Sequence, residues 1–144
     1  MKKVKSIIEN KGNEVYSITS SAAVFDALVI MAEKEVGALL VIDEGQIRGI
    51  ISERDYARKV VLKGKNSSDS TVKDIMTHDV VYVSPDTTLD EVMALMLNKR
   101  IRHLPVLENE KLTGLISIGD VVKAVIEDKG YLINELEQYI NYRR

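Results

Sequence analysis

The residues best suited to bind a ligand are a serine and an aspartate three positions apart, and this pair occurs twice. Ser52 and Asp55 form the first pair, and Ser117 and Asp120 form the second. A carboxylate at the start of a helix can accept both hydroxyls of a ribose, and a serine on the same turn can add a contact. The same spacing defines a helix capping box, in which the two side chains bond to backbone N–H groups. The sequence therefore predicts two diol clamps or two capping boxes, and one pair can serve both purposes.

The cations that can bind a phosphate are divided between the two copies. Arg54 and Arg58 accompany the first pair, whereas Arg102 and His103 precede the second. Arginine binds phosphate through paired N–H donors, and a helix N-terminus adds further donors. If the copies pack about a pseudo-twofold axis, these side chains face one another across one cleft and form a phosphate site. The alternative is that they are solvated surface charges.

Both pairs lie at equivalent places in an internal repeat. Residues 15–62 align with residues 80–127 without a gap, and the apolar positions coincide. Apolar residues recur at the i, i+3, i+4, i+7 spacing of an amphipathic helix over 24–32 and again over 89–97. Two short runs rich in Val, Ile and Leu follow in each copy and predict a hairpin. The hairpin strands are expected at 38–43 and 47–52, and at 103–108 and 112–117.

A final helix, expected at 53–62 and 118–127, places each pair at the junction of a strand and a helix. Each copy is thus predicted to run strand, helix, strand, strand, helix. A three-stranded sheet with both helices on one face leaves apolar surface uncovered, so two units should pack together. The predicted fold class is α/β (α+β), with two tandem β-α-β-β-α units related by pseudo-twofold symmetry and additional terminal helices.

The polar segment 63–70, which contains Gly and Ser, is typical of a surface connection and separates the copies. Residues 4–9 and 72–76 are predicted to be short helical segments that lead into the first and second copy. The apolar stripe near the C-terminus needs a partner in the same chain or in a second copy. The predicted organisation is residues 1–70 for the first copy with its N-terminal segment and linker, 71–128 for the second copy, and 129–144 for a C-terminal helix.

Composition and charge argue against several classes of protein. With 45% hydrophobic and 29% charged residues, the 144-residue chain is expected to fold around a core. The net charge of −2 argues against nucleic-acid binding. The only feature that favours it is the basic cluster 54–65, which contains Tyr56. Cysteine is absent, which fits a reducing compartment, and no segment approaches the ~20 apolar residues of a membrane helix. We expect a cytoplasmic protein that binds neither membrane nor nucleic acid.

The side chains required for catalysis or metal binding do not combine in a known motif. The two histidines, His78 and His103, have no nucleophile or carboxylate at a motif spacing. His78 and Asp79 would need a third ligand to hold a metal ion, and no Gly-rich phosphate loop occurs. We expect neither an enzyme nor a metal site.

The strand-to-helix junctions resemble the signature of a known family. Residues 49–55 (Gly-Ile-Ile-Ser-Glu-Arg-Asp), 114–120 (Gly-Leu-Ile-Ser-Ile-Gly-Asp) and 102–106 (Arg-His-Leu-Pro-Val) are similar to cystathionine-β-synthase (CBS) domains. Two such domains form the tandem called a Bateman module, and the resemblance covers residues 15–127. It implies two clefts that bind an adenosine-containing ligand such as AMP, ADP, ATP, NAD(H) or S-adenosylmethionine, with no catalytic cofactor. It also implies a homodimer that regulates a partner protein of unknown identity.

The resemblance further implies which residues line the clefts. In the first copy they are Thr19, Val36, Gly37, Ala38, Ser52, Arg54, Asp55 and Arg58, and in the second copy they are Ser84, Arg102, His103, Leu104, Pro105, Ser117 and Asp120. Because Gly37 and Ala38 are smaller than Arg102 and His103, the clefts should be unequal, with more room in the first. Two functions remain open: a sensor of an adenine nucleotide, and a structural dimerisation adaptor without a functional ligand.

Overall fold

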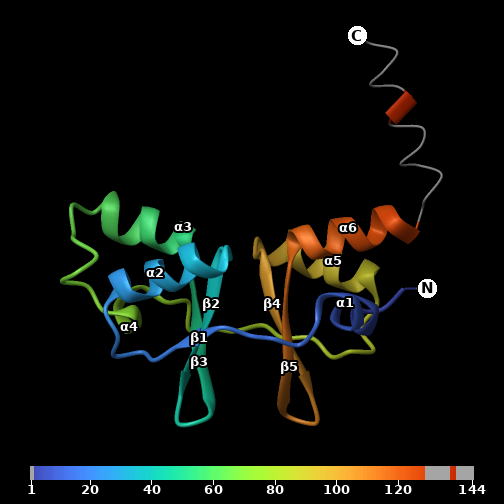
Figure 1. Cartoon of the computed structure of the whole chain (residues 1–144), viewed down its shortest axis with the longest axis horizontal. Helices are drawn as coiled ribbons and strands as arrows, with labels where there is room; N and C mark the ends of the chain where they lie inside the picture. Colours follow the sequence, from blue (N-terminus) through green and yellow to red (C-terminus); the bar gives the residue numbers. More distant parts are fainter. Residues whose placement is uncertain (1, 129–136, 139–144) are drawn as a thin grey trace. The chain divides into compact units, whose positions relative to one another are not determined.

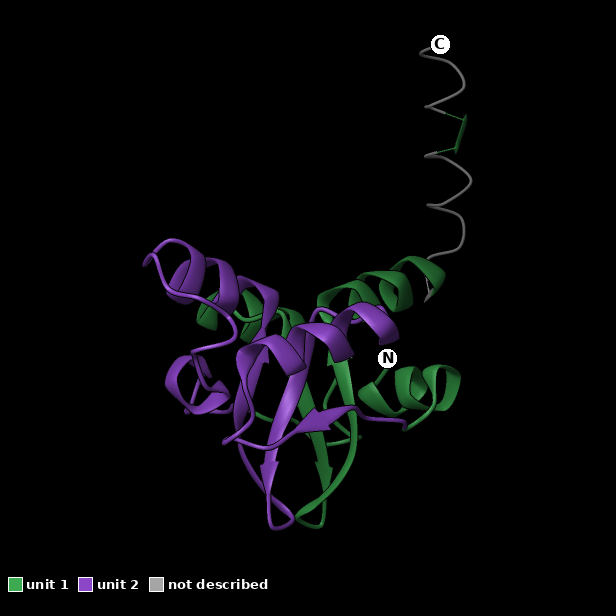
Figure 2. Ribbon diagram, turned by 60° about the vertical axis from the view of Figure 1, so that its left-hand side comes forward, with its two compact units in different colours: residues 1–13, 82–144 green, residues 14–81 purple. Residues whose placement is uncertain are grey.

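The computed structural model describes residues 2–128 and 137–138 of the chain. The chain divides into two compact units, drawn in different colours in Figure 2. Residues 14–81 form the unit that contains the first Ser/Asp pair, and we call it the Ser52 unit. Residues 1–13 and 82–144 form the unit that contains the second pair, and we call it the Ser117 unit.

The Ser52 unit is built on a three-stranded sheet (Figure 1), in which β1 runs parallel to β2 and β2 runs antiparallel to β3. A buried apolar cluster joins the sheet to the helices, with Val24, Met31, Leu39, Ile51 and Val60 among its members. The elements are β1 (Ser17–Ile18), α2 (Val24–Lys34), β2 (Ala38–Asp43), β3 (Gln46–Ser52), α3 (Glu53–Tyr56), the π-helical turn η1 (Ala57–Val61) and α4 (Val72–Ile75).

The Ser117 unit is built on an antiparallel hairpin packed against helices (Figure 1). Its core includes the fully buried Val4, Val92, Leu104, Val106 and Ile116. The elements are α1 (Val4–Lys11), α5 (Leu89–Lys99), β4 (His103–Glu108), β5 (Lys111–Ser117) and α6 (Ile118–Asp128).

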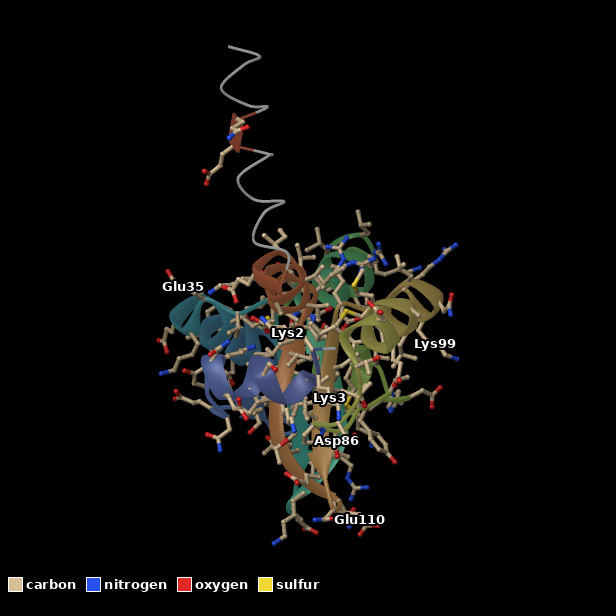
Figure 3. All side chains as sticks on the ribbon, turned by 90° about the vertical axis from the view of Figure 1, so that its right-hand side faces the viewer. Lys2, Lys3, Glu35, Asp86, Lys99 and Glu110 are labelled. Carbon is tan, nitrogen blue, oxygen red and sulfur yellow. The ribbon has the colours of Figure 1, made fainter. Side chains whose placement is uncertain are left out.

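The mixed α and β fold, the amphipathic helices and both hairpins are confirmed. The helices α2 and α5 each end at a residue in the left-handed conformation, Glu35 at φ 54° and Arg100 at φ 55°. The two hairpins share the same register, including an irregularity at Val41/Ile42 and at Val106/Leu107. Figure 3 labels Glu110, which lies at the turn of the β4–β5 hairpin. Among the described residues, no helix has both the length and the hydropathy needed to span a bilayer.

The predicted first strand of the second copy is wrong, because only a single bridge forms there. Val83 pairs with Val106 as Ile18 pairs with Val41, but the neighbouring pair is missing. In the Ser52 unit the Leu40 N–H donates to the Tyr16 carbonyl at 3.4 Å. The equivalent of Leu40 is Pro105, which has no N–H to donate. The pairing therefore stops after one residue.

The final helix of the first copy also differs from the uniform helix that the repeat predicts. After α3, the chain widens into η1, where the Leu62 N–H donates to the Ala57 carbonyl at 3.1 Å, five residues earlier. The wider turn keeps Val60 fully buried while Leu62 is 77% exposed. In the second copy α6 is a regular α-helix.

The two leading segments pack on the opposite copy from the one expected. The Val4 N–H donates to the Thr87 carbonyl at 2.9 Å, and a backbone bridge joins Lys3 to Thr88. Figure 3 labels Lys3 and Asp86, which lie on these two segments. In the same way, α4 belongs to the Ser52 unit, where the Val72 N–H donates to the Ala22 carbonyl at 2.9 Å.

The two compact units therefore do not follow the predicted boundary between residues 70 and 71. The apolar faces of the leading segments, with Val4 and Ile7 in one and Val72 and Ile75 in the other, are buried where they meet these surfaces. The predicted C-terminal helix 129–144 lies outside the described residues, apart from 137–138. The predicted pseudo-twofold packing concerns the placement of one unit against the other and stays a prediction.

Candidate functional site

The first Ser/Asp pair forms a reciprocal capping box where β3 passes into α3. The Asp55 N–H donates to Ser52 Oγ at 3.1 Å, and the Ser52 N–H donates to Asp55 Oδ2 at 3.0 Å. The Ser52 hydroxyl also donates to Asp55 Oδ2 at 3.0 Å. The capping interpretation is therefore confirmed for this pair. The Asp55 side chain keeps 14% of its surface exposed.

A lysine holds the other carboxylate oxygen of this pair. Lys59 Nζ lies 3.1 Å from Asp55 Oδ1, one helical turn further along the chain. The same ammonium group donates to the Ile75 carbonyl at 2.8 Å, at the end of α4. Lys59 thus ties the carboxylate of the first pair to the leading segment that packs in the Ser52 unit.

The second Ser/Asp pair repeats the cap where β5 passes into α6. The Asp120 N–H donates to Ser117 Oγ at 3.1 Å, and the Ser117 N–H donates to Asp120 Oδ2 at 2.8 Å. Here the lysine is Lys11, the last residue of α1. Its Nζ donates to Asp120 Oδ2 at 2.7 Å and to the Leu115 carbonyl at 2.8 Å. The Asp120 side chain is 25% exposed.

Two titratable groups near the second pair are shifted by their surroundings. Burial of Asp120 favours its neutral form, but the bonds from Lys11 and Ser117 outweigh burial and hold the pKa of Asp120 below its usual value. Burial lowers the pKa of His103, and the positive charges of Lys11 and Arg102 lower it further, against the opposing effect of Asp120. His103 is therefore neutral near pH 7 and supplies hydrogen-bonding atoms, not the positive charge expected from the sequence.

Some predicted cleft residues lie beside the pair of their own unit. The Glu53 N–H donates to the Gly37 carbonyl at 3.0 Å, and Ala38 pairs with Ser52 across the hairpin. In the Ser117 unit the Ile118 N–H donates to the Arg102 carbonyl at 2.9 Å, and His103 pairs with Ser117. Gly37, Ala38, Arg102 and His103 are thus brought to the starts of α3 and α6, whereas the Val36 N–H donates to the Met31 carbonyl at the end of α2.

Other predicted residues belong to the core or lie elsewhere in their unit. Ala38 is 2% exposed, Leu104 is fully buried and Pro105 is also buried, so these residues can offer a ligand little besides backbone atoms. Thr19 follows β1 beside the far end of β2, where the neighbouring Ser20 bonds to Asp43. Ser84 lines a separate hollow of about 400 Å³ near Tyr82, Thr87 and Leu107. Thr19 and Ser84 are therefore not brought to the Ser/Asp pair of their own unit.

The arginines differ in exposure. Arg54 is half-buried on α3, and Arg58 is exposed on η1. Arg102 is exposed and lines an open groove of about 700 Å³ along α6, together with Ile118, Gly119, Val122, Lys123, Ile126 and Glu127. The predicted phosphate site, in which Arg54 and Arg58 face Arg102 and His103, joins residues of different units and stays a prediction.

A family model now identifies the repeated unit. The model described as the CBS domain matches residues 4–62 and 72–127. The chain belongs to the CBS domain family. Each matched segment begins with a leading helix that packs in the unit formed mainly by the other segment. Each CBS sequence therefore contributes to both compact units.

Several CBS proteins are similar over most of the chain. The mitochondrial CBS domain-containing protein CBSX3 of Arabidopsis thaliana is 36% identical over 95% of this chain and 71% of its own length. A protein with CBS domains from Burkholderia ambifaria is 52% identical, with a TM-score of 0.85 over 88% of this chain and 96% of that one. The CBS domain pair of protein MJ0100 is 24% identical, with a TM-score of 0.78 over 89% and 98% of the two chains, and shares the fold.

The two lysines are the residues of the CBS site that sequence reasoning missed. Lys59 lies four residues after Asp55 on the same helix, a spacing at which opposite charges meet, so its contact was readable from the sequence. Lys11 lies 109 residues from Asp120 and reaches it only because α1 packs in the Ser117 unit. No sequence spacing indicates that contact.

The described part of this CBS pair contains no cluster suited to a metal ion. Across residues 2–128 and 137–138, no three His, Asp or Glu side chains are grouped as metal ligands. His78 and Asp79 are both exposed in the connection after α4.

Proposed function

We propose that this CBS pair binds an adenine nucleotide, AMP, ADP, ATP or NAD(H), and communicates the bound state to a partner protein without catalysing a reaction. The observation that carries the proposal is the recurrence of one Ser/Asp geometry at equivalent strand-to-helix junctions in both units, with each carboxylate partly exposed at 14% and 25%. The structure of the MJ0100 domain pair, described with 5′-methylthioadenosine and S-adenosyl-L-methionine, supports an adenosine-containing ligand.

In this proposal the capped carboxylates also act as diol clamps. A carboxylate has about four lone-pair sites, and the cap uses only part of them. Asp55 and Asp120 would accept ribose hydroxyls, the backbone of residues 36–38 and 102–105 would contact the base, and the arginines would bind phosphate. Thr19 and Ser84 would have to contact the ligand at a place away from the clamp of their own unit.

A thermal-shift panel with AMP, ADP, ATP, NAD, NADH and S-adenosylmethionine tests the proposal. A ligand at ~100 times its Kd should add about 2.7 kcal/mol to the free energy of unfolding. Asp55→Asn and Asp120→Asn should reduce the shift, because an amide oxygen can still accept the capping N–H but binds two hydroxyls less well. Asp90→Asn is the matched control, since Asp90 is an exposed carboxylate in the first turn of α5. A flat panel would contradict nucleotide sensing.

Exposed apolar side chains on the helices favour a second function. Phe25 and Leu62 are 50% and 77% exposed in the Ser52 unit, and Leu97 and Val122 are 74% and 49% exposed in the Ser117 unit. Apolar residues gathered on helix surfaces suit association with another protein. We expect a homodimer, and a structural dimerisation adaptor would keep it while giving a flat nucleotide panel. Sedimentation of the wild type and of Leu97→Glu measures the assembly.

The cytoplasmic location stays a prediction, because the Arabidopsis relative is described as mitochondrial. The absence of nucleic-acid binding is also a prediction. Salt-sensitive binding of an oligonucleotide would contradict it.

A further inference from the structure

Lys11 occupies the second clamp from a different part of the chain. It is the last residue of α1, and its Nζ bonds to Asp120 Oδ2 at 2.7 Å and to the Leu115 carbonyl at 2.8 Å. We propose that Lys11 competes with ligand hydroxyls for Asp120, so that a ligand engages the second clamp by displacing the end of α1. This inference rests on the proposed nucleotide-binding function and assigns a specificity-determining role to a residue outside the Ser/Asp motif.

One oxygen of the carboxylate, Oδ2, has its acceptor sites filled while Lys11 is in place. Asp120 Oδ2 already accepts the Ser117 N–H at 2.8 Å in addition to Lys11. A carboxylate oxygen has about two lone-pair sites, and a vicinal diol that spans the carboxylate needs one site on each oxygen, so it requires Oδ2 as well as Oδ1. The ammonium group and the diol therefore compete for the same face of Asp120.

The contact is placed so that it can be broken without unfolding α1. The Lys11 and Asp120 side chains are 39% and 25% exposed, and partly exposed ion pairs are weak because water competes for both charges. The other end of α1 is held by buried Val4 and Ile7 and by the backbone bond from Val4 to Thr87. Only the last turn of α1 depends on the clamp.

A groove beside the contact gives the displaced side chain somewhere to go. It has a volume of about 370 Å³ and is lined by Ile7, Asn10, Lys11, Asp120, Lys123, Ala124 and Glu127. Glu127 offers a second carboxylate in the same groove. The Lys11 side chain can therefore leave Asp120 and keep a polar neighbour.

The first clamp lacks this arrangement. Its lysine, Lys59, lies on the same helical segment as Asp55 and bonds to the Ile75 carbonyl at the end of α4, 16 residues away. In the second copy the position equivalent to Lys59 is Ala124, which lines the groove next to Lys11. The second clamp therefore couples ligand binding to α1, whose lysine lies 109 residues from Asp120, whereas the lysine of the first clamp is local to its carboxylate.

The test measures adenosine binding by calorimetry on the full chain with Asp55→Asn, which isolates the second clamp. Lys11→Met should tighten adenosine binding about threefold to fivefold, because a broken exposed ion pair corresponds to a factor of this order. Lys5→Met, an exposed lysine on the same helix, is the matched control and should leave the affinity unchanged. AMP should gain less than adenosine, since Lys11→Met also removes a positive charge that attracts an anionic ligand to this unit.

An unchanged or weaker adenosine affinity in Lys11→Met would overturn the inference while leaving the proposed function intact. A loss of AMP binding with no change for adenosine would also overturn it, because Lys11 would then be a phosphate ligand. If adenosine binds neither the parent chain nor any variant, the proposed function fails and the inference fails with it.

A measurement of hydrogen exchange adds a readout on α1 itself. The Gly12 N–H donates to the Ile8 carbonyl at 2.8 Å and reports on the last turn of α1. Without ligand, Lys11→Met should raise its exchange more than Asp120→Asn, because Lys11 also bonds to the Leu115 carbonyl, and the double variant should match Lys11→Met. Saturating adenosine should raise it in the wild type. Protection of Gly12 by adenosine would overturn the inference.

Discussion

The Ser52 and Ser117 units share a backbone plan and differ in how they complete it. Both place a capped aspartate at the end of a hairpin, and both satisfy that aspartate with a lysine that also bonds a backbone carbonyl. The lysine is local in the first case and comes from 109 residues away in the second. The repeat thus preserves the charge at each carboxylate but not the element that supplies it.

The same contrast appears where each leading segment packs on a hairpin glycine. A Cβ on Gly49 would lie 2.6 Å from the Thr77 carbonyl oxygen and 2.9 Å from Met76 Sδ. A Cβ on Gly114 would lie 2.5 Å from Ile8 Cδ1, the far end of a flexible side chain. A backbone atom cannot move aside without shifting the segment, whereas a side chain can change rotamer.

The largest expected effect is therefore from alanine at the first of these glycines. Gly49→Ala should lower the free energy of unfolding by about 3 kcal/mol, and Gly114→Ala by about 1 kcal/mol. Urea denaturation of both variants measures the difference. Ile8→Val removes the conflicting methyl group and should recover part of the loss in Gly114→Ala. Equal losses at the two glycines would show that the leading segments pack with the same rigidity in both units.

A second prediction uses the two histidines, which lie in different units. The lowered pKa of His103 means that the folded state binds fewer protons than the unfolded state between that pKa and about 6.5. The free energy of unfolding should therefore fall as the pH drops from 7 to 5. His103→Gln should flatten this slope, and urea denaturation at several pH values measures it. His78→Gln, an exposed position in the Ser52 unit, is the control. If His103→Gln leaves the dependence of the free energy of unfolding on pH unchanged, a group other than His103 is responsible for it.

The sequence predicted the parts of the fold that depend on local pattern. Amphipathic spacing and hairpin turns are properties of neighbouring residues, so α2, α5 and both hairpins could be placed. The missing strand pairing at Pro105 was also readable, because proline cannot donate the bond that Leu40 donates. It was overlooked because the repeat implied that both copies form the same strands.

The exchange of the leading segments was not predictable from the same pattern. The apolar faces of α1 and α4 indicate that each segment must be covered, but not by which hairpin. The contact between Lys11 and Asp120 follows from that exchange and so was also out of reach. The Ser/Asp pairs were found, since capping and diol binding both require the same short spacing.

The smallest expected effect comes from the lysines that distinguish the clamps. Lys59→Met and Lys11→Met should each lower the free energy of unfolding by at most about 1 kcal/mol, because both lysine side chains are partly exposed, at 44% and 39%. The location of the effect should differ. Hydrogen exchange should rise in α3, η1 and α4 for Lys59→Met, and in the last turn of α1 for Lys11→Met. A loss above about 2 kcal/mol in Lys11→Met would mean that the contact is part of the folding core, since an ion pair of that strength would not yield to a ligand hydroxyl.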